Sequence, residues 1–280
     1  MLTRGANEAR SNDICAIKKN ITEWLNQSST TTPHIDPDDH SKRGLKHNTT
    51  GLLCPIELDW DNLEVQQKIH DCNEGYDVSE SMYPRLLYKA GKGDPEDVEK
   101  GIFRNPLLVK VFLAIFTSLS SAKKVATFDV ENPNDSDGSE KKTHKEPSSK
   151  AIKSNVAQKL NLNKVTPCTI AYSAVILHFL LSDAMAWKSM HNGFNYELFY
   201  NLIVDYFEDA EGDQAKECVK SLLAWWNRYV LDSLFYQNEA NIRYRQIFPK
   251  CSAATAASRA SIKKLCEQRA CRKAGAGAKA

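Results

Sequence analysis

The sequence predicts an all-α protein: a single irregular helical domain of about seven or eight helices, with a disordered internal loop and a basic C-terminal tail. Two observations support this. Apolar residues recur at helical spacing through much of the chain, most densely between Thr166 and Arg228. Sustained apolar–polar alternation is missing, and we find no Asn-Gly or Asp-Gly turn between apolar runs, so strands are not expected.

The N-terminal third of the chain contains two expected helices. After a flexible N-terminus at residues 1–10, apolar residues at helical spacing predict a helix over 11–25. A polar stretch covers residues 28–47. The sequence Asp61-Asn-Leu-Glu64 is typical of a capping box and predicts a short helix that ends at His70.

Three cap-then-proline pairs predict further helix starts, at Asp94-Pro95, Asn105-Pro106 and Thr166-Pro167. In each pair a side-chain oxygen can accept from a free amide of the first turn, and proline fits the first helical position. The helix after Asn105 is apolar nearly all round, so we expect it to be buried centrally. A last core helix is expected from Asp213 through Trp226.

The domain boundaries follow from composition. Residues 11–228 are expected to form the helical domain, interrupted by a disordered loop at 123–150 that is rich in Asp, Asn, Ser, Lys and Pro. Residues 246–280 form the basic tail. The cysteines contain no Cys-x-x-Cys pair, and the chain is much longer than a disulfide-stapled miniprotein, so a reducing compartment is expected.

Charge is strongly segregated although the net charge is only +2. Residues 36–99 contain 15 acidic and 7 basic residues, whereas residues 241–280 contain 10 basic residues against the single acid Glu267. The acidic stretch is interpreted as solvated surface. The tail is either a disordered solubilising segment or a contact region for nucleic acid or an acidic partner. The candidate contacts are Arg259, Lys263, Lys264, Arg269, Arg272 and Lys273.

Metal and cofactor sites are not expected. His47, Cys54, His70 and Cys72 have zinc-ligand chemistry, but their spacing is irregular and Cys54 opens what looks like a buried turn. The tail cysteines, at positions 251, 266 and 271, lack a fourth partner nearby. No phosphate-binding loop, dinucleotide fingerprint or Gly-x-Ser-x-Gly motif is found.

Catalytic residues are not expected either, and the chain is interpreted as more consistent with a non-enzyme. The carboxylates Asp205, Glu208 and Asp209 are typical of a solvated helix end, although paired carboxylates can also act as acid and base. His178 lies on an apolar helix and is interpreted as a satisfied core histidine. An enzyme with an unrecognised site stays open, and it would require Asp205, Glu208 and His178 to surround one pocket.

The adjacent tryptophans Trp225 and Trp226 could stack bases or a partner's side chains. Adjacent helical positions point about 100 degrees apart, so the two rings cannot share one exposed platform. We therefore expect Trp226 in the core and Trp225 at its edge. Arg228 is close enough for a carboxylate pair or a cation–π contact.

The location expected from the sequence is the cytoplasm or the nucleus. The N-terminus contains no apolar segment of the kind found in secretory signals. The longest apolar run, Ile170 to Leu181, is too short to span a bilayer, so no membrane is expected.

Three ordered blocks carry a family resemblance: Gly51-Leu-Leu-Cys-Pro with Asp59-Trp60; Gly101-Ile-Phe-Arg-Asn-Pro-Leu-Leu-Val-Lys with Ile115 to Ala122; and Val165-Thr-Pro-Cys-Thr-Ile-Ala-Tyr leading to Phe194-Asn-Tyr, Phe199 to Glu208 and Trp225-Trp-Asn-Arg228. The chain resembles a family of uncharacterised proteins, a domain of unknown function, that is expanded in mushroom-forming (basidiomycete) fungi. The resemblance covers roughly residues 10–228. It implies an intracellular fungal protein and no assigned activity, cofactor or catalytic residue.

The sequence departs from the pattern of these relatives directly after Arg228. Their pattern continues only at Gln246-Ile247-Phe248-Pro249, so Tyr229 to Arg245 is an insertion of seventeen residues. It is either a retained intron in the gene or a genuine helix extension, and sequencing of the mature transcript distinguishes the two.

The leading functional hypothesis is a non-catalytic intracellular interaction protein with an unknown protein partner. The alternatives are a nucleic-acid-associated protein that binds through the basic tail and an enzyme with an unrecognised site.

Overall fold

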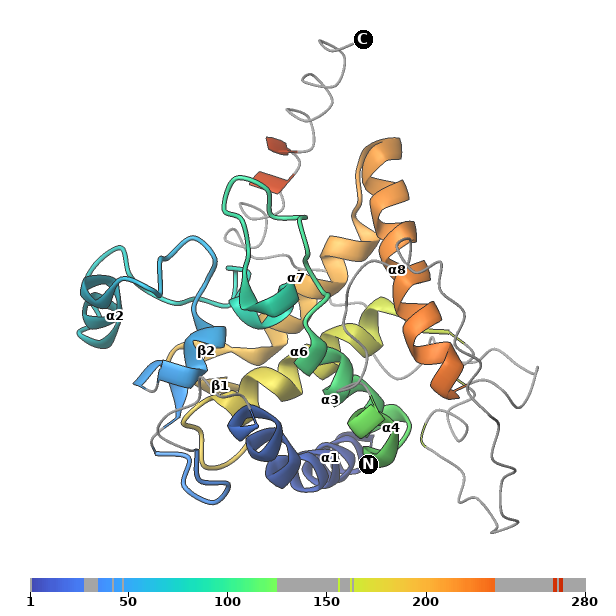
Figure 1. Ribbon diagram of the computed structural model, residues 1–280, viewed down its shortest axis with the longest axis horizontal. Helices are drawn as coiled ribbons and strands as arrows, with labels where there is room; N and C mark the ends of the chain where they lie inside the picture. Colours follow the sequence, from blue (N-terminus) through green and yellow to red (C-terminus); the bar gives the residue numbers. More distant parts are fainter. Residues whose placement is uncertain are drawn as a thin grey trace.

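The computed structural model describes residues 2–27, 35–41, 43–46, 48–124, 156, 162, 164–234, 264–265 and 267–268. Within these residues the chain forms seven α-helices, four short 3-10 helices and one two-stranded antiparallel hairpin. The protein is mostly helical, as predicted (Figure 1). The internal loop from residue 125 and most of the tail lie outside the described residues.

The elements follow one another along the chain in this order: α1 (Leu2–Asn26), η1 (Gly44–Lys46), η2 (Asn48–Leu53), α2 (Leu63–His70), η3 (Arg85–Leu87), η4 (Lys89–Gly91), α3 (Pro106–Phe116), α4 (Leu119–Lys124), α6 (Pro167–Leu181), β1 (Met190–His191), β2 (Phe194–Asn195), α7 (Tyr196–Glu208) and α8 (Gly212–Leu234).

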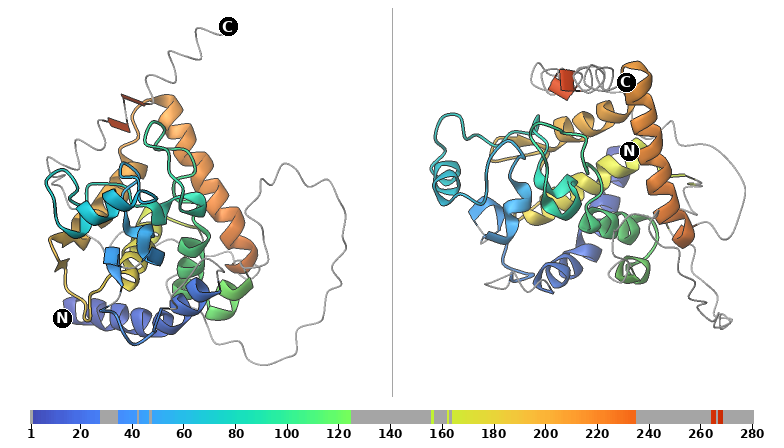
Figure 2. Two further views of the ribbon diagram at one scale, coloured as in Figure 1. Left: turned by 60° about the vertical axis from the view of Figure 1, so that its left-hand side comes forward. Right: turned by 45° about the horizontal axis from the view of Figure 1, so that its top comes forward.

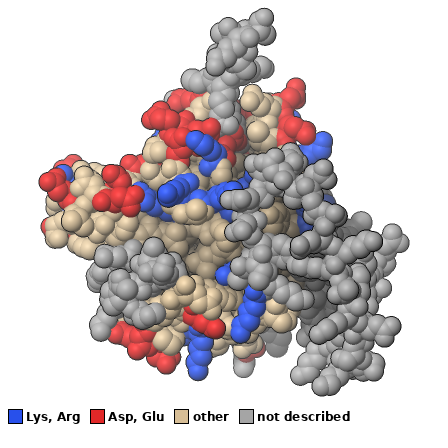
Figure 3. Space-filling model, viewed as in Figure 1, with Lys and Arg blue, Asp and Glu red and all other residues tan. Residues whose placement is uncertain are grey.

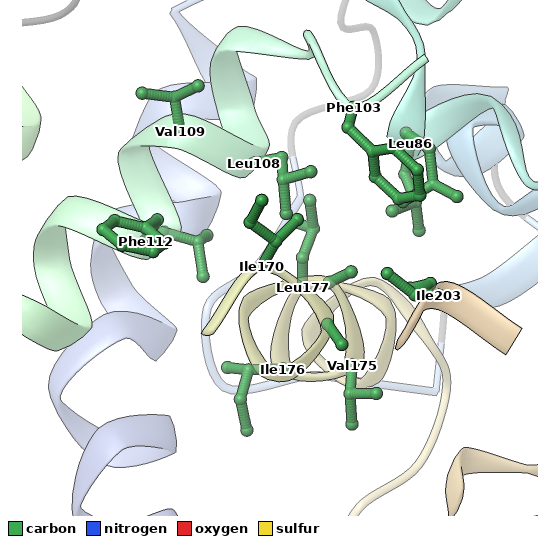
Figure 4. Close-up of a cluster of buried hydrophobic side chains, with 14 of the residues drawn as sticks. Leu86, Phe103, Leu108, Val109, Phe112, Ile170, Val175, Ile176, Leu177 and Ile203 are labelled. Atoms are coloured by element: carbon green, nitrogen blue, oxygen red, sulfur yellow. The ribbon is translucent and has the colours of Figure 1, made fainter. Parts of the chain in front are cut away.

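Helix α6 is the centre of the fold. Twelve of its 15 residues are buried, which is why its apolar residues show no preferred face. Helices α1, α3 and α7 pack against it. Figure 4 shows Leu108 of α3 beside Ile170, and Ile203 of α7 beside the opposite flank of the helix. One continuous core therefore joins segments from both halves of the sequence.

Two of the three cap-then-proline predictions are confirmed. The Asn105 side chain accepts from the Leu107 N–H at 2.9 Å at the start of α3, which is largely buried as expected. Thr166 and Thr169 form a reciprocal capping box at the start of α6. Both caps pair amides that the helix leaves without a carbonyl partner.

The helix predicted at Asp94-Pro95-Glu96-Asp97 is wrong. The segment forms successive turns, in which the Asp97 N–H donates to the Asp94 carbonyl and the Lys100 N–H donates to the Asp97 carbonyl, both at 3.0 Å. In an α-helix the Val98 N–H would donate to the carbonyl of Asp94. Here it donates instead to a side chain of the C-terminal tail. The local signal for a helix therefore gives way to turns that bring Gly101 back to Lys89, whose N–H donates to the Gly101 carbonyl at 3.0 Å.

The expectation of no Asn-Gly hairpin is also wrong. Strands β1 and β2 pair antiparallel, with Met190 opposite Asn195 and His191 opposite Phe194. Asn192 and Gly193 form the turn with φ values of 49° and 81°. Asparagine and glycine are the residues that adopt these angles most readily in two-residue hairpins. The strands are too short to produce a visible alternation in the sequence.

Helices α1 and α8 extend past their expected ends. α1 begins at Leu2, and its residues 5–9 are exposed. α8 continues beyond Arg228 to Leu234, and Val230 is fully buried in the core. Residues 229–234 thus continue helix α8, and sequencing of the mature transcript is the test of the whole insertion. Among the described residues, no helix has both the length and the apolar character needed to cross a membrane.

Candidate interaction site

The turns at 94–98 hold a short helical piece of the C-terminal tail against the domain. The described tail residues are Lys264, Leu265, Glu267 and Gln268, which we call the docked turn. In Figures 1 and 2 these residues lie beside the loop that contains residues 94–98. More than 160 residues of sequence separate the two segments.

The Gln268 side chain forms two hydrogen bonds with the backbone of the 94–98 segment. Its Oε1 accepts from the Val98 N–H at 3.0 Å, and its Nε2 donates to the Pro95 carbonyl at 2.9 Å. An amide is the side-chain group that supplies one donor and one acceptor in this geometry. The pair of bonds therefore fixes the register of the tail on the domain.

Leu265 anchors the docked turn. It is 1% exposed and packs into the main hydrophobic core, together with Val98, which is 2% exposed. Burying a leucine side chain contributes about 1.5–3 kcal/mol, which is more than either hydrogen bond of Gln268 contributes at about 0.5–1.5 kcal/mol. Affinity at this contact therefore comes mainly from Leu265, and register comes from Gln268.

A charge pair completes the contact. Lys264 Nζ lies 3.6 Å from the Glu57 carboxylate, with the two side chains 47% and 27% exposed. An ion pair this exposed contributes at most about 1 kcal/mol. Figure 3 shows acidic side chains gathered around the 94–99 loop. These acidic residues belong to the acidic stretch of the sequence, and Lys264 is the basic tail residue that pairs with Glu57.

A buried tyrosine lies close enough to Glu57 and Asp97 for their charges to affect it. The Tyr88 ring is fully buried, and its hydroxyl has no hydrogen-bond partner among the described residues. Burial, reinforced by Tyr83 and Glu57, raises the pKa of Tyr88 well above its usual range. The hydroxyl therefore stays protonated, and the charge at this site belongs to surface carboxylates such as Glu57.

A second polar cluster surrounds the C-terminal end of α6. His191 Nε2 lies 2.7 Å from Asp183 Oδ1, and the buried Arg43 donates to the Leu180 carbonyl at 2.8 Å. His40, 3% exposed, contacts the backbone of Ser182. Basic groups favour the negative end of a helix dipole, so this cluster is explained as a helix terminus satisfied by side chains.

The predicted acid–base candidates do not come together. His178 is buried against Phe194, with ring centroids 3.9 Å apart, and against Tyr196 and Phe199. Asp205 lies six residues after Phe199 in α7, which is about 9 Å along a helix axis. Burial and the neighbouring carboxylates Asp209 and Glu208 raise the pKa of Asp205.

The prediction that His178 is a satisfied core histidine is only half right. It is buried, but neither ring nitrogen has a hydrogen-bond partner among the described residues. Burial lowers the pKa of His178 to about 3, with a smaller contribution from His191. His178 is therefore a neutral ring stacked in an aromatic environment.

The zinc candidates are dispersed. Cys54 is fully buried, its thiol donates to the Leu58 carbonyl at 3.7 Å, and burial raises the pKa of the thiol to about 12. His70 contacts the Leu45 carbonyl, and Cys72 is exposed. His47 lies outside the described residues, as do the tail cysteines. Over the part of the chain that the structure describes, no three metal-ligating side chains form a group.

The tryptophan pair behaves as expected from helix geometry. Trp226 is fully buried and packs on Phe112, whereas Trp225 is half-buried and contacts Tyr229 with centroids 4.5 Å apart. The cation over Trp225 is Arg104, at 5.4 Å from the ring centroid, and comes from the segment before α3.

Of the six basic tail residues predicted as contacts, the structure describes only Lys264, which faces a carboxylate of its own chain. Arg259, Lys263, Arg269, Arg272 and Lys273 lie outside the described residues. Sequence reasoning missed Leu265 and Gln268, the two residues that make most of the contact. Their spacing of three, one helical turn, was the available signal.

Comparison with known proteins gives one match, to a family. Residues 4–231 match a family of unknown function, DUF6698. No curated protein matches the chain. No solved structure matches it either. The docked turn lies outside the matched residues.

Proposed function

The chain belongs to DUF6698, a family of unknown function, and we propose that it is a non-catalytic interaction protein that binds short basic helical segments. The binding site is the surface that holds the docked turn. We call it the docking surface, defined by Glu57, Pro95, Val98 and the part of the hydrophobic core that buries Leu265, which we call the seat of Leu265. The single observation that supports this proposal is the docked turn itself, which is a ligand already seated in the site.

Three kinds of contact at the docking surface together define the segment that it binds. A buried leucine supplies affinity, a glutamine three residues later supplies register, and a lysine beside the leucine supplies charge complementarity. Together these contribute about 3–7 kcal/mol before the cost of ordering the segment. A free energy of about 7 kcal/mol corresponds to a Kd of about 10 μM, so such a site binds between about 10 μM and 1 mM, which suits a transient partner.

A peptide in trans tests the proposal. The full chain carries Leu265→Asp, which places a carboxylate in an apolar seat and vacates the docking surface. A fluorescein-labelled peptide with the sequence of residues 256–275 is then titrated with this protein, and fluorescence anisotropy is measured. We expect saturable binding with a Kd between about 10 μM and 1 mM.

Matched variants separate specific docking from charge attraction. A peptide that carries Leu265→Asp should bind at least about tenfold more weakly, because it loses the leucine burial. Glu57→Gln in the protein should weaken binding by no more than about fivefold, and Glu217→Gln on α8 should leave it unchanged. Equal binding of the two peptides would contradict the proposal.

Nucleic acid is the second candidate ligand, and it would bind to the basic tail rather than to the domain. The ion pair between Lys264 and Glu57 supports an anionic partner for this segment. Binding of a single-stranded oligonucleotide that falls steeply with added salt and is lost on deletion of residues 241–280 would favour this candidate. Salt-insensitive binding would exclude it.

The proposal retains two expectations from the sequence. We place the protein in the cytoplasm or nucleus and its family among mushroom-forming (basidiomycete) fungi. Among the described residues Cys15, Cys54, Cys72 and Cys168 are free thiols, which supports a reducing compartment.

A further inference from the structure

We infer that the docked turn is a self-inhibitory ligand, so that a partner segment reaches the docking surface only by displacing the protein's own tail. The inference rests on the proposed function, because it assigns regulation to the same site. Its basis is that the docked turn uses every contact that recognition of a partner would use: the seat of Leu265, both backbone groups read by Gln268, and the Glu57 carboxylate.

The tether gives the tail an advantage over any free segment of the same sequence. A segment joined to its site by the chain acts at an effective concentration on the order of 1 mM. If the isolated contact has a Kd between about 10 μM and 100 μM, the tail occupies its own site at least about nine-tenths of the time. A free partner then binds with an apparent affinity reduced by about 10-fold to 100-fold.

A substitution at Gln268 can weaken the contact between the docked turn and the docking surface without changing any residue of the domain. Its amide both donates to the Pro95 carbonyl and accepts from the Val98 N–H. A glutamate of the same shape can accept from Val98 but cannot donate to Pro95. Its charge would also lie beside the acidic residues Asp94, Glu96 and Asp97. Gln268→Glu should therefore release the tail and leave the docking surface intact.

The amide proton of Val98 reports directly on docking in the full-length protein. Val98 is 2% exposed, and its N–H donates to Gln268. We expect Gln268→Glu to accelerate hydrogen exchange at Val98 at least tenfold, with little change at amides inside α6. Gln67→Glu is the matched control, because Gln67 is an exposed glutamine whose amide donates to Asp71 on α2. This control should leave exchange at Val98 unchanged.

The same proteins are then titrated with the labelled peptide of residues 256–275. We expect Gln268→Glu to bind it at least threefold more tightly than the unaltered protein, and Gln67→Glu to bind it as the unaltered protein does. Unchanged exchange at Val98, or faster exchange with equal peptide affinity, overturns the inference. Failure of the peptide to bind even the Leu265→Asp protein overturns the proposed function instead, so the two failures are distinguishable.

Discussion

Replacing Arg43 with leucine should lower the free energy of unfolding by about 3–5 kcal/mol. The guanidinium is 1% exposed and donates to three backbone carbonyls: Leu180 at 2.8 Å, Asp36 at 2.8 Å and Pro37 at 2.9 Å. Leucine fills part of the volume but leaves these carbonyls without their donor. Urea unfolding of Arg43→Leu, followed by circular dichroism, measures the loss.

Two variants make the Arg43 prediction specific. Arg43→Lys keeps the charge but cannot span three carbonyls with one ammonium group, so it should recover only part of the stability. Lys220→Ala removes an exposed cation that pairs with Glu217 at 3.3 Å, and it should change stability by less than about 0.5 kcal/mol. A loss of under 1 kcal/mol for Arg43→Leu would show that the end of α6 does not depend on this side chain.

Acidification should unfold the protein through its buried histidines. Burial lowers the pKa of His178 to about 3, and burial together with Arg43 and Lys18 lowers the pKa of His40 to about 4. In the unfolded chain both rings titrate near about 6.5, so the unfolded state binds more protons between pH 6.5 and 4. Stability is therefore complete above pH 6.5 and falls by about 1.4 kcal/mol per pH unit for each histidine below it.

The variant His178→Phe separates the contribution of His178 to the pH dependence of stability from that of His40. Phenylalanine retains the ring stacked on Phe194 and removes two nitrogens that lack partners. Its free energy of unfolding should exceed that of the unaltered protein by about 1–3 kcal/mol at pH 7, and its acid slope should be smaller by one proton. Identical slopes for the two proteins, measured by urea unfolding at pH 4.5, 5.5 and 6.5, would contradict the assignment to His178.

The helices that the sequence predicts well are those whose signals are local. The Asn105 and Thr166 caps act within their own first turn, so the residues that make the contact adjoin in sequence. Asp94 presents the same local signal, and its carboxylate does accept from the Glu96 N–H at 3.1 Å. The helix does not form there because the segment closes into successive turns that return the chain to Lys89, whose N–H donates to the Gly101 carbonyl at 3.0 Å, a contact that no local pattern contains.

Of the candidate site, only the pairing of an acidic surface with a basic tail could be predicted from the sequence. The acidic 36–99 stretch and the basic tail are visible in the sequence, and Lys264 opposite Glu57 follows that expectation. The leucine seat and the glutamine bonds depend on which surfaces meet after folding. The Asn192-Gly193 turn, by contrast, was readable from its two residues and was missed because the flanking strands are only two residues long.

The bonds between Gln268 and the 94–98 turns also have a consequence for synthesis. The Val98 amide and its acceptor are 170 residues apart, so a growing chain exposes this amide long before its partner has been translated. Contacts of such long sequence separation form late, because the loop-closure entropy is lost before the contact forms. Val98 and the seat of Leu265 therefore stay uncovered until residues 265 and 268 have been synthesised. During that interval a chaperone or a neighbouring nascent chain meets the same surface that the tail later covers.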